Sequence, residues 1–159
     1  MPARNSKLKP EQSSDPVSAR KRAMDFLAQR EHGEQEITRK LVSRGFDNEV
    51  VEAAVSELIS DGLLSDSRFA EAFVHSRFKK GSGPQKIRAE LRQRGIDDAL
   101  ISASMEAIAE QWLERVREVR EKKFGPGTPG DFKERSRQMR FLQQRGFTSE
   151  QISGAFEDA

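Results

Sequence analysis

The 159-residue chain contains no cysteine and no tyrosine, and it has only one tryptophan and two histidines. The lack of cysteine excludes disulfides, thiol nucleophiles and zinc–thiolate sites, and it is typical of a protein of the reducing cytoplasm. Apolar residues never run more than three in a row. We therefore expect neither a membrane-spanning segment nor the apolar region of a signal peptide.

Apolar material is also scarce, since apolar residues make up 35% of the chain and charged residues 34%. A core built from so few apolar residues is thin, and most helices must keep one side in water. The length suffices for one compact domain or for a short string of small helical units. The composition favours the string, in an elongated arrangement.

The net charge is only +2, but acidic and basic residues are sorted along the chain. Residues 47–66 hold six acids and no base, and residues 97–114 hold five acids and no base. Residues 68–94 hold eight bases and two acids, and residues 133–145 hold five bases and one acid. Such blocks indicate a polyanion or a charged protein partner, unless acidic and basic helices neutralise each other within the fold.

A seven-residue segment occurs three times. Leu41–Asp47 reads LVSRGFD, Leu91–Asp97 reads LRQRGID, and Leu142–Thr148 reads LQQRGFT, with spacings of 50 and 51 residues between the Arg-Gly pairs. Glycine in the left-handed conformation ends a helix, the apolar residue after it packs on the last turn, and Asp or Thr caps the next helix. Each segment therefore predicts a joint between two helices, in one of three tandem repeats.

The shared arginines of these segments, Arg44, Arg94 and Arg145, suit the negative end of a helix dipole, and we assign them mainly to structure. Seven residues before the arginine stands Ile37 in the first copy and Ile87 in the second. Gln138 breaks this pattern in the third copy.

A further helix precedes each joint, so each repeat has three helices and the chain is predicted to be all-α, without strands. Asp15-Pro16, Ser65-Asp66 and Gly83-Pro84 are helix starts, and residues 98–124 contain neither Gly nor Pro and predict one continuous helix that joins the second repeat to the third. A Gly- and Pro-rich loop follows at residues 125–130. We assign residues 1–14 to a disordered polar tail and the repeats to residues 15–62, 63–109 and 110–159.

No residue pattern indicates catalysis or a bound metal. His32 and His75 are isolated, and Asp97-Asp98 is read as a helix cap because neighbouring side chains on a helix point about 100° apart. The loop at 125–130 lacks the lysine and the preceding strand of a phosphate-binding loop. We expect no catalytic residue, no metal and no cofactor.

Comparison of the repeats identifies a candidate binding surface in the second one. Arg88 and Arg92 share a helix face, whereas the first repeat has Thr38 and Val42 there. Close to them, a Gly-Ser-Gly-Pro turn at residues 81–84 is expected to offer free amides to an anion at a helix start. The candidate binding residues are Arg68, Arg77, Lys79, Lys80, Lys86, Arg88 and Arg92. The alternative is a solvated basic face, and for nearby Phe78 we favour packing over base stacking.

Three segments carry a resemblance to a known family. LLSDSRFA at 63–70, KGSGPQKIRAELRQRGI at 80–96, and KFG at 123–125 with RFLQQRGF at 140–147 resemble the RecX family of bacterial recombinase regulators. The resemblance covers about residues 17–157, with Gly33 standing where the family often has a serine cap.

The resemblance implies a non-enzymatic, cytoplasmic and monomeric protein of recombination and SOS DNA repair. Such a protein binds the RecA filament on DNA and mainly inhibits its ATPase, strand-exchange and coprotease activities. Its DNA binding, to single or double strands, is weak and independent of sequence. Two alternatives stay open: a helix-turn-helix DNA-binding regulator, which would bind bare DNA with sequence preference, and a protein scaffold that ignores DNA.

Overall fold

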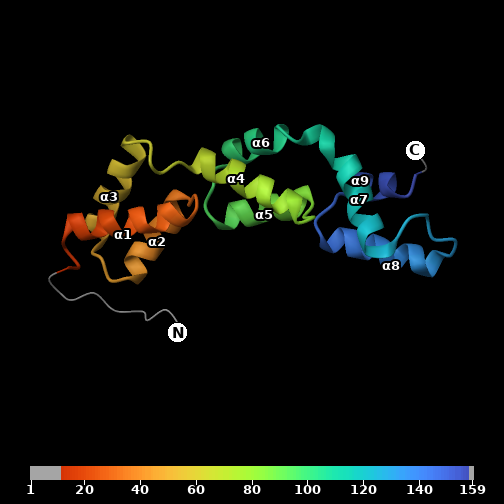
Figure 1. The fold of residues 1–159 in the computed structure, drawn as a ribbon, viewed down its shortest axis with the longest axis horizontal. Helices are drawn as coiled ribbons and strands as arrows, with labels where there is room; N and C mark the ends of the chain where they lie inside the picture. The colour runs from red at the N-terminus through yellow and green to blue at the C-terminus, as the bar shows by residue number, and fades with distance from the viewer. Residues whose placement is uncertain (1–11, 158–159) are drawn as a thin grey trace. The chain divides into compact units, whose positions relative to one another are not determined.

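The protein is described from a computed structural model that covers residues 12–157, and this range is all-α, as the sequence predicts. Figure 1 shows its helices in chain order. They are α1 (Pro16–Gln29), α2 (Glu34–Ser43), α3 (Asn48–Ser60), α4 (Asp66–Lys79), α5 (Pro84–Gln93), α6 (Asp98–Glu106), the 3₁₀ turn η1 (Ala109–Gln111), α7 (Trp112–Phe124), α8 (Phe132–Gln144) and α9 (Ser149–Ala155). No strand occurs between residues 12 and 157.

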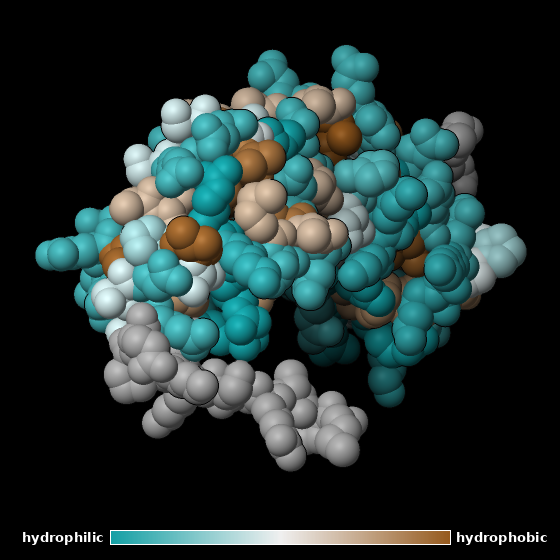
Figure 2. Space-filling view, turned by 60° about the vertical axis from the view of Figure 1, so that its left-hand side comes forward, coloured by the Kyte–Doolittle hydropathy of each residue, from teal (hydrophilic) through white to brown (hydrophobic). Residues whose placement is uncertain are grey.

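The chain divides into two compact units, residues 1–70 and 71–159, and the boundary in the sequence lies within α4. In the first unit, α1, α2 and α3 pack around a small apolar core. Its members are Ala19, Ala23, Ile37, Leu41, Phe46, Val51, Ala54, Leu58 and Leu64. The face of the molecule shown in Figure 2 is mostly hydrophilic, with apolar residues in patches among polar ones. No helix in residues 12–157 is long and apolar enough to cross a membrane.

The three predicted joints are confirmed. Gly45, Gly95 and Gly146 have φ of 101°, 79° and 98°, in the region that only glycine adopts easily. After each glycine, the amide of Phe46, Ile96 or Phe147 donates to a carbonyl five residues earlier, at 3.1 to 3.2 Å. This backbone pattern closes the last turn of the helix and buries the apolar residue against it.

The start of α2 is capped from a distance. Gly33 occupies the N-cap position and has no side chain to offer. The carboxylate of Asp66, at the first position of α4, instead accepts a hydrogen bond from the Glu34 amide at 2.7 Å. This contact explains how the chain tolerates glycine at a position where a serine cap is common.

His32 is buried between two partners in the first unit. Its Nδ1 lies 2.9 Å from the carbonyl oxygen of Arg30, and its Nε2 lies 2.8 Å from Nζ of Lys40. A ring that donates from Nδ1 and accepts the lysine proton at Nε2 is neutral. Burial lowers the pKa of His32, and the charge of Lys40 lowers it further.

The lowered pKa of His32 predicts that the first unit loses stability in acid. The unfolded chain binds a proton near pH 6.5 and the folded chain only at lower pH, so stability should fall as pH drops below about 6.5. Melting temperatures measured between pH 7.5 and 5.5 should show this fall in the wild type and less of it in His32→Gln. The exposed His75 provides the control. A pH dependence reduced as much in His75→Gln as in His32→Gln would contradict the assignment.

The predicted continuous helix over residues 98–124 is wrong. Helix α6 ends at Glu106, Ile108 leaves helical geometry at φ −119° and ψ 13°, and α7 begins at Trp112. Trp112 packs edge-on against Phe78 and Phe147, with ring centroids 5.2 and 6.2 Å away. These tertiary contacts position the start of α7 and outweigh the local helix propensity of residues 107–111.

Two glycines form a close backbone contact inside the second unit. The Gly83 amide donates to the Arg145 carbonyl at 2.6 Å, and the Gln85 amide donates to the Gly146 carbonyl at 2.9 Å. A Cβ atom on Gly83 would lie 2.3 Å from the Gly146 carbonyl carbon, and one on Gly146 would lie 2.4 Å from Cβ of Lys86. The start of α5 therefore packs directly against the joint after α8. We call this close contact between Gly83 and Gly146, with the two hydrogen bonds beside it, the glycine seam.

Gln138 interrupts the apolar repeat pattern because a buried arginine lies beside it. Arg120 of α7 is 4% exposed, and its guanidinium donates to the carbonyls of Ala155 at 3.1 Å and Gly127 at 2.8 Å. A third, longer contact reaches Oε1 of Gln138 at 3.5 Å. Arg120 thus ties the loop after α7 to the end of α9, and a polar side chain at position 138 suits this interior better than isoleucine does.

The predicted polar tail covers residues 1–14, of which residues 1–11 lie outside the described part of the chain. Residues 12–14 form a turn, and the Ser13 carbonyl accepts a hydrogen bond from the Asp47 amide at 2.9 Å. The assignment of these last three residues to a disordered tail is therefore wrong.

Candidate functional site

Arg88 and Arg92 both lie on the exposed side of α5, as the helical spacing predicts. Arg92 donates from Nε to Oδ1 of Asp98 at 3.0 Å, in a pair that is mostly in water. Arg88 has no ion pair within residues 12–157 and lines a recess of about 430 Å³ with Met105 and Trp112 at its apolar part. Arg88 is therefore the freer of these two cations.

Two other predicted site residues are held by acids. Nε of Arg68 lies 3.0 Å from Oε1 of Glu31 in the first unit. Nε of Arg77 lies 3.1 Å from Oε2 of Glu90, without the angle of a hydrogen bond, and the guanidinium stacks 4.7 Å from the centre of the Phe73 ring. Arg77 is less than one-third exposed. Its contacts support a packing role between α4 and α5, and part of the charge sorting is thus neutralised internally.

The expected anion site at the start of α5 is wrong. Residues 81–84 are buried, and the amides of Gly83 and Gln85 already donate to the carbonyls of the glycine seam. Lys86 is exposed, with its Cα and Cβ close to Gly146. The two amides that flank Pro84 at this helix start are thus already used by carbonyls of another joint and are not available to an anion.

Lys79 and Lys80 are exposed at the end of α4 and line a pocket of about 470 Å³. Further basic residues from α7 and the end of α8 line the same pocket. Its complete lining is Lys79, Lys80, Gly81, Arg115, Val119, Lys122, Lys123, Phe141 and Arg145, and we call it the basic pocket. It contains six cations and no acid.

The structure thus separates the seven predicted residues. Lys79 and Lys80 belong to the basic pocket, whereas Arg88 lines a different recess with α6 and α7. Arg68 lies in the other compact unit. Within the second unit, the structure does not bring the other six together as one cluster.

Four cations of the basic pocket were missed as site residues. Arg115, Lys122 and Lys123 have helical spacing that places them on one side of α7, which is a signal that the sequence contains. Arg145 has counterparts in Arg44 and Arg94 and was therefore assigned to structure. It does have a structural contact, since its Nη1 lies 3.4 Å from the Lys80 carbonyl, but it also lines the pocket.

Within residues 12–157, no group of His, Cys, Asp or Glu side chains is arranged to hold a metal ion. Phe78 packs against Trp112, as expected for a residue of the interior. The candidate site is therefore a set of basic side chains on α4, α5, α7 and α8, whose chemistry is the binding of anions.

Family models match all three repeats of the chain. The model for the first three-helix domain of RecX matches residues 19–58, that for the second domain matches residues 65–105, and that for the third matches residues 109–156.

Curated relatives and solved structures agree with these matches. The chain is 46% identical over 137 residues to "Regulatory protein RecX" of Pseudomonas syringae pv. tomato, covering 86% of this chain and 88% of the relative. It is 45% identical to the protein of that name from Halorhodospira halophila, over 87% and 86%. A crystal structure of regulatory protein RecX has the same fold, with a TM-score of 0.76, 24% identity and coverage of 87% of this chain and 71% of that one. The chain belongs to the RecX family.

Proposed function

We propose that this protein is a non-enzymatic regulator that binds the RecA filament on DNA and mainly inhibits RecA. The activities it would lower are ATP hydrolysis, strand exchange and coprotease activity, in recombination and SOS repair in the cytoplasm. The observation that carries the proposal is the match of all three repeats to RecX domains, in order and along most of the chain.

The charge distribution supports such a partner. Lys79, Lys80, Lys86 and Arg88 are exposed and have no ion pair within residues 12–157. Exposed and uncompensated cations attract phosphates and acidic protein surfaces, and a nucleoprotein filament offers both. Arg92 can join them, because an ion pair exposed to water is weak and exchanges readily for a new partner.

Binding to the filament tests the proposal. Fluorescently labelled protein is titrated with preformed RecA filaments on single-stranded DNA and, separately, with the same DNA alone. We expect tight binding to the filament and weaker, sequence-independent binding to DNA, both weakened by salt. Equal affinity for filament and bare DNA would contradict a specific RecA partner, and a strong preference for one DNA sequence would favour a helix-turn-helix regulator instead.

A further inference from the structure

The basic pocket lies where three helices end. Helix α4 ends at Lys79, α7 at Phe124 and α8 at Gln144, and residues from the last turns of these helices or just after them line the pocket. Carbonyl groups at a helix end carry partial negative charge, so basic residues gather there in many proteins for structural reasons alone.

The helix ends account for only part of the charge. Each helix end contributes about −0.5 elementary charge, so three together contribute roughly −1.5. Among the described residues 12–157, the only acid paired with a lining residue is Glu118, whose Oε2 lies 2.8 Å from Nη1 of Arg115. Glu121 lies on another side of α7, about 145° around the helix from the centre of the lining residues at 100° per residue. Six cations, less one for Glu118 and roughly 1.5 for the helix ends, leave an excess of roughly +3.5.

Two arginines of the pocket are held in place by the backbone. Arg115 donates from Nε to the Phe78 carbonyl at 3.0 Å and from Nη2 to the Lys79 carbonyl at 2.9 Å. Arg145 donates from Nη1 to the Lys80 carbonyl at 3.4 Å, and its guanidinium also lies 5.1 Å from the centre of the Phe141 ring. Each guanidinium has five N–H donors, and these contacts use only some of them. An anion that binds here therefore meets arginines that are already ordered, which reduces the entropy cost of binding.

The aromatic ring of the pocket is not free for base stacking. Nζ of Lys123 lies 5.6 Å from the centre of the Phe141 ring, and Phe124 meets that ring edge-on with centroids 5.2 Å apart. Together with Arg145, these side chains surround the ring. The pocket thus offers charge and N–H donors, and it offers no flat surface for a base.

We propose that the basic pocket binds neighbouring backbone phosphates of a single strand of nucleic acid. Each phosphodiester carries one negative charge, so an excess of roughly +3.5 is larger than one phosphate neutralises. A flexible single strand can bend two or more phosphates into a recess, whereas a duplex is stiff over about 150 base pairs. Because the contacts go to phosphate, binding is independent of sequence. This inference rests on the DNA-binding part of the proposed function and names the residues that perform it.

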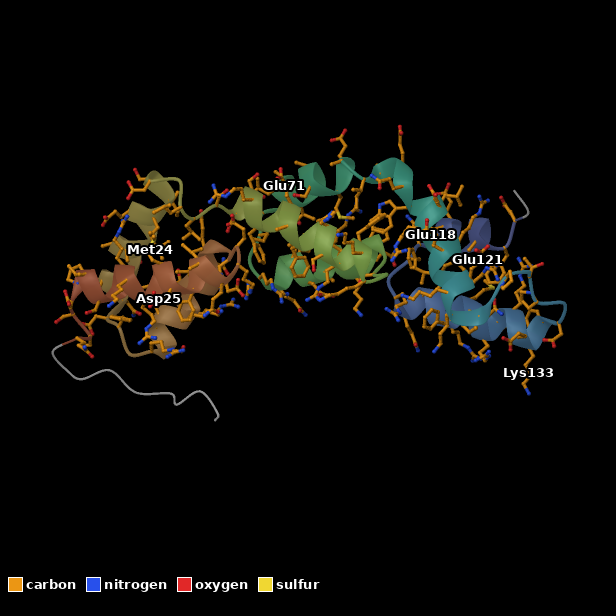
Figure 3. The ribbon with its side chains drawn as sticks, in the orientation of Figure 1. Met24, Asp25, Glu71, Glu118, Glu121 and Lys133 are labelled. Atoms are coloured by element: carbon orange, nitrogen blue, oxygen red, sulfur yellow. The ribbon has the colours of Figure 1, made fainter. Side chains whose placement is uncertain are left out.

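The test removes two pocket charges and compares the salt dependence of DNA binding. Lys80→Gln with Lys122→Gln is suitable, because both side chains are exposed and have no ion pair within residues 12–157. Lys21→Gln with Lys133→Gln is the matched control, since it removes the same charge from exposed positions outside the pocket. Figure 3 shows Lys133 at the start of α8, far along that helix from Arg145.

Affinity for a fluorescent oligothymidylate is measured by anisotropy over a series of KCl concentrations, without RecA. For single strands, log affinity falls with log salt by about 0.7 for each neutralised phosphate, so the pocket variant should show a slope shallower by about 1.4. The control should keep the wild-type slope, and circular dichroism should show the same melting temperature for both variants.

Two results would overturn the assignment. One is a folded pocket variant with the wild-type slope. The other concerns ATP. If millimolar ATP protected the wild type but not the pocket variant against thermal unfolding, and the DNA slope of the variant were unchanged, the pocket would be assigned to a free nucleotide. RecA is absent from this experiment, so its outcome is separate from the test of the proposed function. The wild type could inhibit RecA although the pocket variant keeps the wild-type slope, or fail to inhibit RecA although the pocket variant shows the shallower slope.

Discussion

Gly83→Ala is expected to destabilise the second unit by about 3 kcal/mol, the upper part of the range for overpacking. Gly83 has φ of −83°, so its backbone conformation suits alanine. The cost arises from space alone, because the new methyl group would lie 2.3 Å from both the carbonyl carbon of Gly146 and the amide nitrogen of Phe147. Backbone atoms cannot turn aside as a side chain can, so the two joints must separate and strain or break the 2.6 Å hydrogen bond between them.

Gly146→Ala should be at least as costly, since φ is 98° there and the Cβ atom would also meet Lys86. Gly125→Ala is the matched control, because Gly125 has φ of 85° but open space around it. The control should therefore cost less than Gly146→Ala, because without a clash it carries only the penalty, about 1 to 3 kcal/mol, for a backbone conformation (φ 85°, ψ 172°) that glycine alone adopts easily. Urea unfolding monitored by circular dichroism measures all three. If Gly83→Ala kept wild-type stability, the close approach of the glycine seam would be contradicted.

Arg88→Glu combined with Arg92→Glu should raise the concentration needed for half-maximal inhibition of RecA by about tenfold or more, a loss of about 1.4 kcal/mol of binding or greater. Four units of charge change on an exposed face of α5, and within residues 12–157 the only ion pair that is lost is that of Arg92 with Asp98. That pair is exposed, so the free energy of unfolding should change by about 1 kcal/mol or less. Inhibition should therefore fall in a protein that remains folded.

Lys21→Glu with Lys133→Glu is the control for this experiment, since it changes the net charge equally at exposed positions elsewhere. Titrating the double variant against bare DNA and against filaments distinguishes contacts to phosphate from contacts to acidic RecA side chains. A weaker salt dependence on bare DNA would indicate phosphate, whereas loss of filament binding with unchanged DNA binding would indicate acidic RecA side chains. Wild-type inhibition by the folded double variant would remove this face of α5 from the mechanism.

Local features of the fold were predictable because local residues determine them. The Arg-Gly pairs at 44–45, 94–95 and 145–146 predict helix ends, and all three glycines have positive φ. Thr148, the predicted cap of the last helix, likewise forms a capping box with Gln151 three residues later. In each case the cause lies within a few residues of the feature.

Features that depend on distant residues were not predictable. Gly83 has an ordinary backbone conformation, and the need for glycine arises from Gly146, which lies in a different repeat. The interruption between α6 and α7 accompanies the packing of Trp112 on Phe78 and Phe147, which the local sequence does not reveal.

The candidate site shows the same division. Comparison of repeats identifies residues that lack counterparts, such as Arg88, but it does not show which cations acids already hold, such as Arg77. It also assigns Arg145 to structure because arginine recurs at that position in each repeat, although in the third repeat this residue lines the basic pocket. A residue can serve the fold and a binding site together.

We propose that this chain restrains RecA. The most direct measurement is the rate of ATP hydrolysis by RecA on single-stranded DNA as the protein is added to preformed filaments. We predict a fall in rate that saturates with protein concentration, and a weaker effect as salt is raised. An unchanged rate at saturating concentrations of folded protein, at low salt, would contradict the claim.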